Sequence, residues 1–124
     1  MGTGSFVELE VYRLAEELAD KVWEIVQGWG SFAMTTVGRQ IVRSSDSIGA
    51  NIAEGVGRWS FRDNKRFVRV ARGSLNETIH WIRRCKSRRL FDEIESGDLQ
   101  RIVDKLAPKL NAYLRSIGAL SVGK

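Results

Sequence analysis

The spacing of apolar residues constrains the fold of this chain most, because it repeats at intervals of three and four along four segments. That spacing gathers apolar side chains on one face of an α-helix, and no segment shows the alternation typical of a strand. The predicted helices span residues of about 6–28, 36–54, 61–88 and 97–118. Since the connections between them are short, the sequence predicts an all-α, antiparallel, up-down-up-down four-helix bundle.

The predicted helix ends carry recognisable capping signals. Ser5 with Glu8, and Ser60 with Asp63, have the spacing of capping boxes at the starts of the first and third segments. In the last segment the apolar seam continues across Pro108. Glycines follow the ends of the first two segments, at positions 28, 30, 55 and 57.

Length and composition indicate one domain over residues 1–124, large enough to bury a hydrophobic core without disulfides. The single cysteine, Cys85, has no partner within the chain, which is typical of a reducing compartment. No apolar run approaches the roughly 20 residues needed to span a bilayer, and the first residues lack the features of a secretion signal. We therefore expect a cytoplasmic protein with no membrane partner.

Charge is distributed unevenly along a chain whose net charge is +5. Residues 62–89 hold ten basic and two acidic residues, a balance of +8, and eight of the ten are arginines, which suit bidentate phosphate contact. Trp59 and Trp81 could stack on unpaired bases. A solvated helix face, or a surface for an acidic protein, are the alternatives. The predicted nucleic-acid-binding residues, for RNA or DNA, are Arg62, Lys65, Arg66, Arg69, Arg72, Arg83, Arg84, Lys86, Arg88 and Arg89.

The stretch SSDSIGANIAEGVGR, residues 44–58, places small and polar residues inside the second predicted helix. Its small residues, together with Ala71-Arg72-Gly73-Ser74 on the third helix, predict close packing of these two helices. Buried polar groups need partners, so we expect the polar residues to satisfy one another and to fix the helix register. The predicted structural motif consists of Ser47, Asn51, Glu54, Arg58, Ser74 and Glu77.

The sequence contains no complete set of residues typical of a catalytic site. Glu77 and His80 have the Glu-x-x-His spacing of di-iron bundles, but a di-iron site needs two such motifs and the chain has one histidine. No nucleophile motif and no glycine-rich phosphate loop is present. The sequence therefore predicts no enzyme activity, no metal and no cofactor, with Cys85 as an inert small residue.

Several motifs resemble one known family. SIGANIAEGVGR (residues 47–58), ARGSLNE (residues 71–77), the upstream GRQIVRSSDSI and the opening ELEVYRLAEELADKVW are similar to the four-helix-bundle proteins of the 23S rRNA intervening-sequence family. The similarity covers most of residues 6–90. Members often carry Pro-Ser where this chain has Gly49-Ala50, a departure that we do not expect to change the fold.

The resemblance implies a homo-oligomer, commonly a pentamer, with no established enzymatic activity. Members are encoded within inserts in large-subunit rRNA genes or stand alone in genomes. A distantly similar group serves diversity-generating retroelements as accessory proteins that bind a reverse transcriptase and nucleic acid. We therefore expect a non-catalytic oligomer that binds RNA or DNA through the third helix. The alternative is an oligomeric scaffold or adaptor for a protein partner, with no direct nucleic-acid role.

Overall fold

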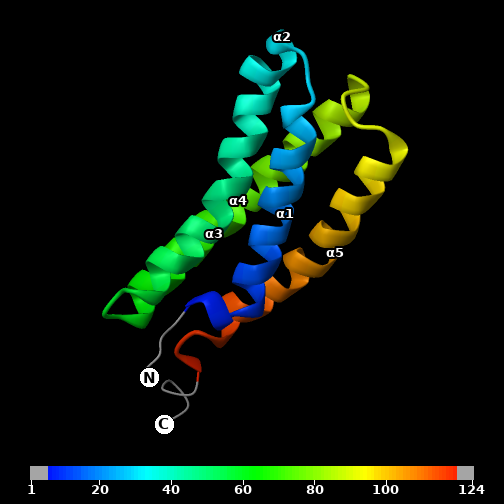
Figure 1. The fold of residues 1–124 in the computed structure, drawn as a ribbon. Coiled ribbons are helices and arrows are strands. Elements are labelled where there is room, and N and C mark those ends of the chain that lie inside the picture. The colour runs from blue at the N-terminus through cyan, green and yellow to red at the C-terminus, as the bar shows by residue number, and fades with distance from the viewer. Residues whose placement is uncertain (1–5, 120–124) are drawn as a thin grey trace.

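Four long helices form the molecule in a computed structural model that describes residues 6–119 (Figure 1). The chain runs up α1, back along α3, up α4 and back along α5 (Figure 1). No strand occurs within the described residues. The prediction of an all-α four-helix bundle is therefore confirmed. The long helices are α1 (Glu10–Gln27), α3 (Arg39–Val56), α4 (Phe61–Ser87) and α5 (Glu93–Ser116).

The helices are arranged so that α1 and α4 lie diagonally across the bundle. Helix α1 packs on α3 and α5, and α4 packs on the same two helices. The outer side of α4 therefore faces away from α1. The core between the four helices consists of aliphatic side chains, of which the largest fully buried ones are Leu18, Ile41, Ile48, Ile52, Leu75, Leu99, Leu106 and Leu110.

The first helix starts later than predicted. Residues Phe6–Glu8 form a 3₁₀ turn, η1, and α1 begins at Glu10 with Leu9 as an N-cap that offers no side-chain hydrogen bond. The predicted capping residue, Ser5, lies outside the described residues. Glu8 belongs to the 3₁₀ turn, so the helix boundary is four residues beyond the predicted one.

The second helical segment starts earlier than predicted, at Ser31. The short helix α2 (Ser31–Ala33) and a π-helical turn, η2 (Met34–Gly38), lead without a break into α3. Gly38 allows this turn to pack against α1, because a Cβ there would lie 2.8 Å from Val26 Cγ1. The predicted connection before residue 36 is therefore reduced to Gly28–Gly30.

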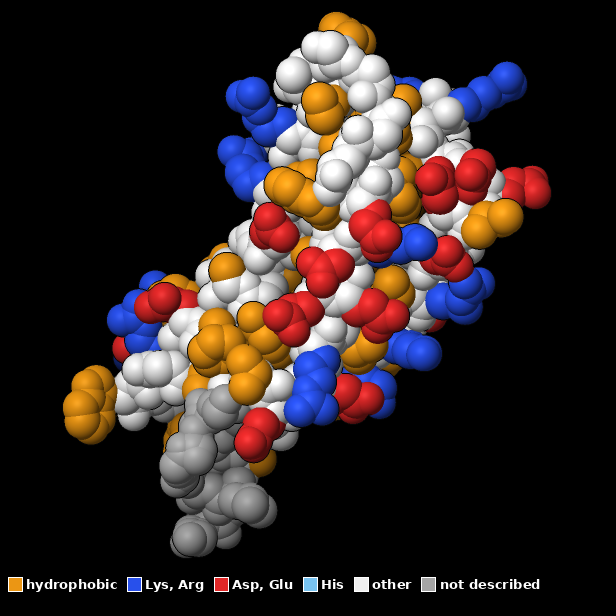
Figure 2. All heavy atoms as spheres, viewed as in Figure 1, with side chains coloured by type: hydrophobic (Ala, Val, Ile, Leu, Met, Phe, Trp, Pro, Cys, Tyr) orange, Lys and Arg blue, Asp and Glu red, His pale blue; other side chains and the backbone are white. Residues whose placement is uncertain are grey.

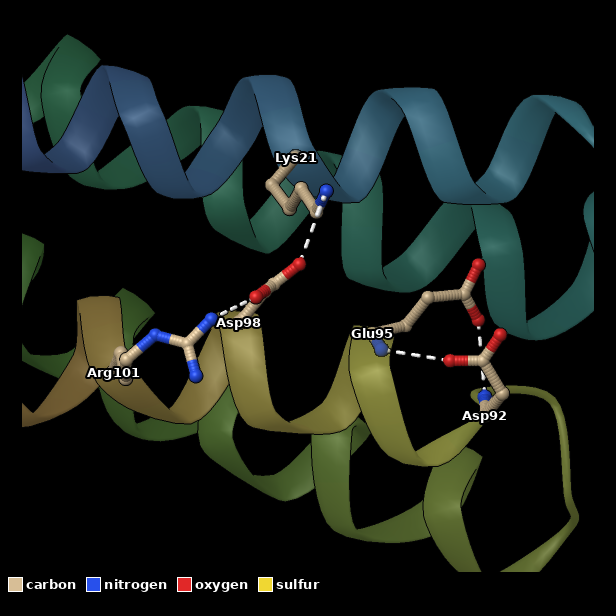
Figure 3. A network of polar contacts seen from close by, with 5 residues as sticks. All are labelled: Lys21, Asp92, Glu95, Asp98 and Arg101. Carbon is tan, nitrogen blue, oxygen red and sulfur yellow. Dashed lines mark hydrogen bonds and ion pairs between the residues drawn. The ribbon is translucent and has the colours of Figure 1, made fainter.

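Capping explains the starts of α4 and α5. Ser60 accepts a hydrogen bond from the Asp63 N–H at 3.1 Å, which gives half of the predicted capping box. Asp92 and Glu95 form a full reciprocal box, with Glu95 N–H donating to Asp92 Oδ1 at 2.7 Å and Asp92 N–H to Glu95 Oε1 at 3.0 Å (Figure 3). This box starts α5 four residues before the predicted position, and α5 runs unbroken through Pro108.

Ion pairs join α1 to α5 at two levels. Lys21 Nζ lies 3.3 Å from Asp98 Oδ2, and Asp98 also binds Arg101 on its own helix (Figure 3). Lys109 Nζ lies 3.4 Å from Glu10 Oε1. Because these groups are partly or largely exposed, each pair contributes little to stability.

The buried face of α4 begins after Phe61 and includes a hydroxyl and a thiol. Phe61 is 54% exposed, whereas Thr78 and Cys85 are fully buried. The aliphatic residues Val68, Ala71, Leu75 and Ile82 are buried on the same helix. Within residues 6–119, no helix combines the length and the apolar content that crossing a bilayer requires.

Candidate nucleic-acid interface

Helix α4 and the turn after it carry the predicted binding residues in two groups, one near each end of the helix. All ten are exposed or half-buried, so their charged ends can reach solvent. We call Arg62, Lys65, Arg66, Arg69 and Arg72 the N-terminal arginine cluster. We call Arg83, Arg84, Lys86, Arg88 and Arg89 the C-terminal arginine cluster.

The N-terminal arginine cluster is held partly by an aromatic ring. The guanidinium of Arg66 lies 4.9 Å from the centre of the Phe67 ring, and that of Arg58, in the turn after α3, lies 4.5 Å from the same ring. Arg66 Nε is also 3.9 Å from Asp63 Oδ1, a separation at which an exposed pair is weak. Within residues 6–119, Arg62 and Arg69 form no ion pair. These arginines therefore keep donors available for an incoming anion.

The C-terminal arginine cluster is placed by a strained helix end. The N–H of Leu90 donates to the carbonyl of Cys85 at 2.9 Å and that of Arg89 to the carbonyl of Lys86 at 3.1 Å, the bond pattern of a Schellman motif. Its left-handed position, with φ of 61°, is occupied by Arg89, where glycine is usual. Arginines here also complement the negative end of the helix dipole.

Between the clusters, residues 73–82 contain no lysine or arginine. Gly73, Asn76 and His80 are exposed there, and a Cβ built on Gly73 would meet no atom within 4 Å. The one acidic residue of this stretch, Glu77, accepts a hydrogen bond from Trp81 Nε1 at 3.1 Å. The outer surface of α4 is therefore basic at both ends and low in charge in the middle.

Acidic side chains gather on another side of the bundle. Figure 2 shows them over α1 and α5, with most of the basic side chains at the margins of that view. Burial, and next the nearby Asp20 carboxylate on α1, raise the pKa of Asp46 on α3 above its usual range. Since α1 lies diagonally across from α4, the acidic side chains on α1 and the arginine clusters on α4 lie on different sides of the bundle.

The polar motif predicted between the second and third helices is divided in the structure. Ser74 Oγ donates to Ser47 Oγ at 3.0 Å, and Asn51 Nδ2 donates to the carbonyl and the hydroxyl of Ser47 at 2.8 Å and 3.0 Å. Thr78 Oγ1 donates to the Ser74 carbonyl at 2.8 Å and lies 2.9 Å from Ser44 Oγ, with which it shares a second hydrogen bond. These five residues join α3 to α4, and we call them the hydroxyl ladder.

The other three members of the predicted motif lie outside the hydroxyl ladder. Glu54, on α3, pairs at 2.6 Å with Arg58 in the turn that follows, and both side chains are exposed. Glu77 is exposed and bonds only Trp81 among the described residues. Each of these side chains therefore bonds a residue four positions away in the sequence and none across the interface between α3 and α4.

The glycines of this region have different roles from those predicted. A Cβ on Gly49 would lie 3.3 Å from the Tyr12 ring, so Gly49 faces α1 rather than α4. The close approach of α3 to α4 occurs at Gly55, where a Cβ would lie 3.1 Å from the Asn64 carbonyl oxygen and 3.2 Å from Phe67 Cβ. Gly73 lies in open surroundings, so the prediction that it allows the two helices to pack closely is wrong.

Sequence reasoning missed an apolar groove where α1 meets η2 and the start of α3. The groove has a volume of about 400 Å³ and is lined by Trp23, Val26, Met34 and Val42 among others. Trp23 is 55% exposed. Its position directly after the core residue Val22 places it off the buried stripe, which is the signal that could have found it.

Tryptophan exposure differs between the two predicted stacking residues. Trp59 is fully exposed in the turn before α4, whereas Trp81 is half-buried and makes an edge contact with His80 at 4.8 Å between ring centres.

Among residues 6–119, no group of three or more His, Cys, Asp or Glu side chains could hold a metal ion. Burial raises the pKa of the Cys85 thiol to about 11, so the thiol stays protonated at neutral pH.

These features define a small four-helix bundle with a basic outer helix. The chain belongs to the 23S rRNA-intervening sequence protein family, whose sequence model matches residues 7–112. A similar solved structure is that of a protein of unknown function from the S23 ribosomal protein family of Bacteroides thetaiotaomicron VPI-5482. It has a TM-score of 0.75 at 21% identity, over 86% of this chain and 99% of that one, which shows a shared fold. Comparison with curated proteins gives no match.

Proposed function

We propose that this protein is a non-catalytic, oligomeric helical bundle that binds RNA or DNA through the two arginine clusters of α4. One observation carries the proposal: ten basic residues, exposed or half-buried, lie along one helix and its terminal turn in a stretch with a balance of +8. Arginines that neutralise phosphates release the counterions condensed on a nucleic acid, and this release supplies affinity without sequence reading. A homo-oligomer, a pentamer by family resemblance, would multiply the affinity of each copy.

The experiment is a binding titration of the purified protein with labelled RNA and DNA at several salt concentrations. We expect the logarithm of the affinity to fall steeply with the logarithm of the salt concentration, with a slope that counts the neutralised phosphates. Reversing Arg66 and Arg69 to glutamate should abolish binding, because the phosphates then face repulsion instead of attraction. The melting temperature should change little, since both side chains are exposed.

The matched control reverses Lys105 and Arg115, two exposed basic residues on α5. This variant carries the same change in net charge and should bind nearly as well as the unaltered protein. Equal losses in both variants would mean that net charge alone drives binding. Unaltered binding in the folded Arg66→Glu/Arg69→Glu protein would remove the proposed surface.

A second candidate function, an oligomeric scaffold or adaptor for a protein partner, is favoured by the exposed apolar groove at Trp23 and Met34. A second copy of this chain is the occupant that the family resemblance implies. Trp23→Ser should then lower the oligomeric state in sedimentation while leaving the helical content unchanged. A variant that assembles normally would remove the groove from the contact between copies.

A further inference from the structure

We propose that α4 crosses the major groove of B-form duplex DNA, with the N-terminal arginine cluster on one phosphate backbone and the C-terminal arginine cluster on the other. This inference rests on the proposed function and specifies its ligand. It follows from three features of α4: the distance between the clusters, the low charge of the stretch between them, and the bare backbone at Gly73.

The spacing of the clusters fits a groove with a backbone on each side. From Arg72 to Arg83 the helix axis advances by about 17 Å at 1.5 Å per residue. The major groove of B-DNA is about 12 Å wide and admits an α-helix, and its phosphates lie along both edges. The long arginine side chains can extend from each cluster to the nearer backbone. The major groove of A-form RNA is too narrow for this arrangement.

A single strand would favour a different surface. Sites for unpaired strands combine a continuous basic track with aromatic rings on which bases stack. The basic track of α4 is interrupted over residues 73–82. The aromatic residue with the largest ring system in that stretch, Trp81, is half-buried with its Nε1 bonded to Glu77, and the exposed Trp59 lies outside the interval between the clusters.

Gly73 supplies the third argument. A glycine inside a helix destabilises it by about 1 kcal/mol relative to alanine. Gly49 and Gly55 are explained by a neighbouring helix, but a Cβ on Gly73 would meet no atom within 4 Å. Nothing in the described molecule therefore requires glycine at this position. Close approach of a ligand to the helix backbone would require it, because a side chain would keep the ligand away. Asn76 and His80, about one and two turns further along, offer hydrogen-bonding groups to base edges.

The first test measures which nucleic acid binds and which cluster contributes. Fluorescence anisotropy is recorded with duplex DNA, duplex RNA and single-stranded DNA of matched sequence at several salt concentrations. We expect duplex DNA to bind at least tenfold more tightly than the other two. Arg66→Gln/Arg69→Gln and Arg83→Gln/Arg84→Gln should each reduce the salt slope on duplex DNA by about two, as expected for two lost phosphate contacts. Lys105→Gln/Arg115→Gln is the control and should leave the slope unchanged.

The second test adds bulk between the clusters. Gly73→Leu should keep or raise the melting temperature and weaken duplex binding at least tenfold. Gly97→Leu is the matched control, because Gly97 lies on α5, where a Cβ would meet only the Arg101 side chain at 3.6 Å. A second copy of this chain is the other molecule that could approach Gly73 closely. Sedimentation of each variant without DNA tests whether it does. If Gly73→Leu dissociates an oligomer and leaves duplex affinity unchanged, the inference is overturned.

The remaining outcomes separate this inference from the proposed function. Equal affinity for single strands, a preference for duplex RNA, or a salt slope that depends on one cluster only would overturn the crossed-groove arrangement and leave nucleic-acid binding in place. A protein that binds none of the three ligands even at low salt would remove the proposed function, and this inference with it.

Discussion

Arg89 is the residue whose conformation is least expected from its chemical type. Its φ of 61° lies in the left-handed region, which disfavours every residue with a Cβ relative to glycine. The Schellman hydrogen bonds of Leu90 and Arg89 hold it there. Arg89 therefore carries a conformational cost that glycine would not carry at this position.

Arg89→Gly should therefore stabilise the protein by about 1 kcal/mol, because glycine adopts this conformation without strain. Urea unfolding followed by circular dichroism measures the change. The control, Arg89→Lys, keeps both the charge and the strain and should leave the unfolding free energy unaltered. No gain in the glycine variant would mean that the surrounding contacts offset the strain.

The hydroxyl ladder acts at the same scale. Thr78→Val keeps the shape of a fully buried side chain but removes the hydroxyl that bonds the Ser74 carbonyl and Ser44 Oγ. We expect a loss of about 1–2 kcal/mol in unfolding free energy and no change in nucleic-acid affinity. Thr35→Val is the control, since Thr35 is exposed and bonds carbonyls of its own helical segment. Lost binding in a fully stable Thr78 variant would show that the ladder is part of the binding surface.

At the scale of the helices, substitution of glycine by alanine should have opposite effects on stability at Gly55 and at Gly73. Gly55→Ala would place a methyl group 3.1 Å from the Asn64 backbone oxygen and 3.2 Å from Phe67 Cβ, so α3 and α4 must separate and stability should fall by about 1–3 kcal/mol. Gly73→Ala meets nothing and should add about 1 kcal/mol through helix propensity. Thermal unfolding of the two variants checks the signs, and a stabilised Gly55→Ala protein would contradict the close packing at Gly55.

The boundaries of α4 were predictable from sequence, whereas those of α3 and α5 were not. In α4, the Ser60 cap and the apolar stripe indicate the same start, and the helix lies within one residue of its predicted limits. The segment before α3 is a π-helical turn with polar threonines, and its pattern fits no regular period. The start of α5 depends on the Asp92–Glu95 box, a signal present in the sequence but weaker there than the later apolar seam.

The candidate site was predictable as a group of charges but not as a set of contacts. The run of arginines within one helical segment places both clusters on α4, and helical spacing gives their separation. The contacts of Arg58 and Arg66 with the Phe67 ring involve α4 and the turn after α3, and that of Arg58 depends on how this turn lies against α4. The local pairing of Glu54 with Arg58 likewise depends on which side of α3 is covered.

At the scale of the whole molecule, burial of Cys85 predicts a loss of stability in alkaline solution. Burial raises the pKa of this thiol from an ordinary 9.0 to about 11. In the unfolded chain the thiol ionises first, so the contribution is complete below pH 9 and is lost as the pH rises toward 11. Thermal unfolding between pH 7 and 11 should show a steeper decline for the unaltered protein than for Cys85→Ala. Tyr12 and Tyr113, whose pKa values are also raised, remain in both proteins. Parallel declines would contradict this assignment.

Labelling of the same thiol can also measure how often the bundle opens locally. Cys85 is the only cysteine of the chain and has no exposed surface, so a maleimide dye can reach it only in molecules whose α4 has briefly left the core. The rate of labelling under native conditions therefore counts opening events without any engineered probe. The labelling rate can be measured with and without a ligand. A lower rate with the ligand would mean that binding at the surface of α4 reduces its local opening.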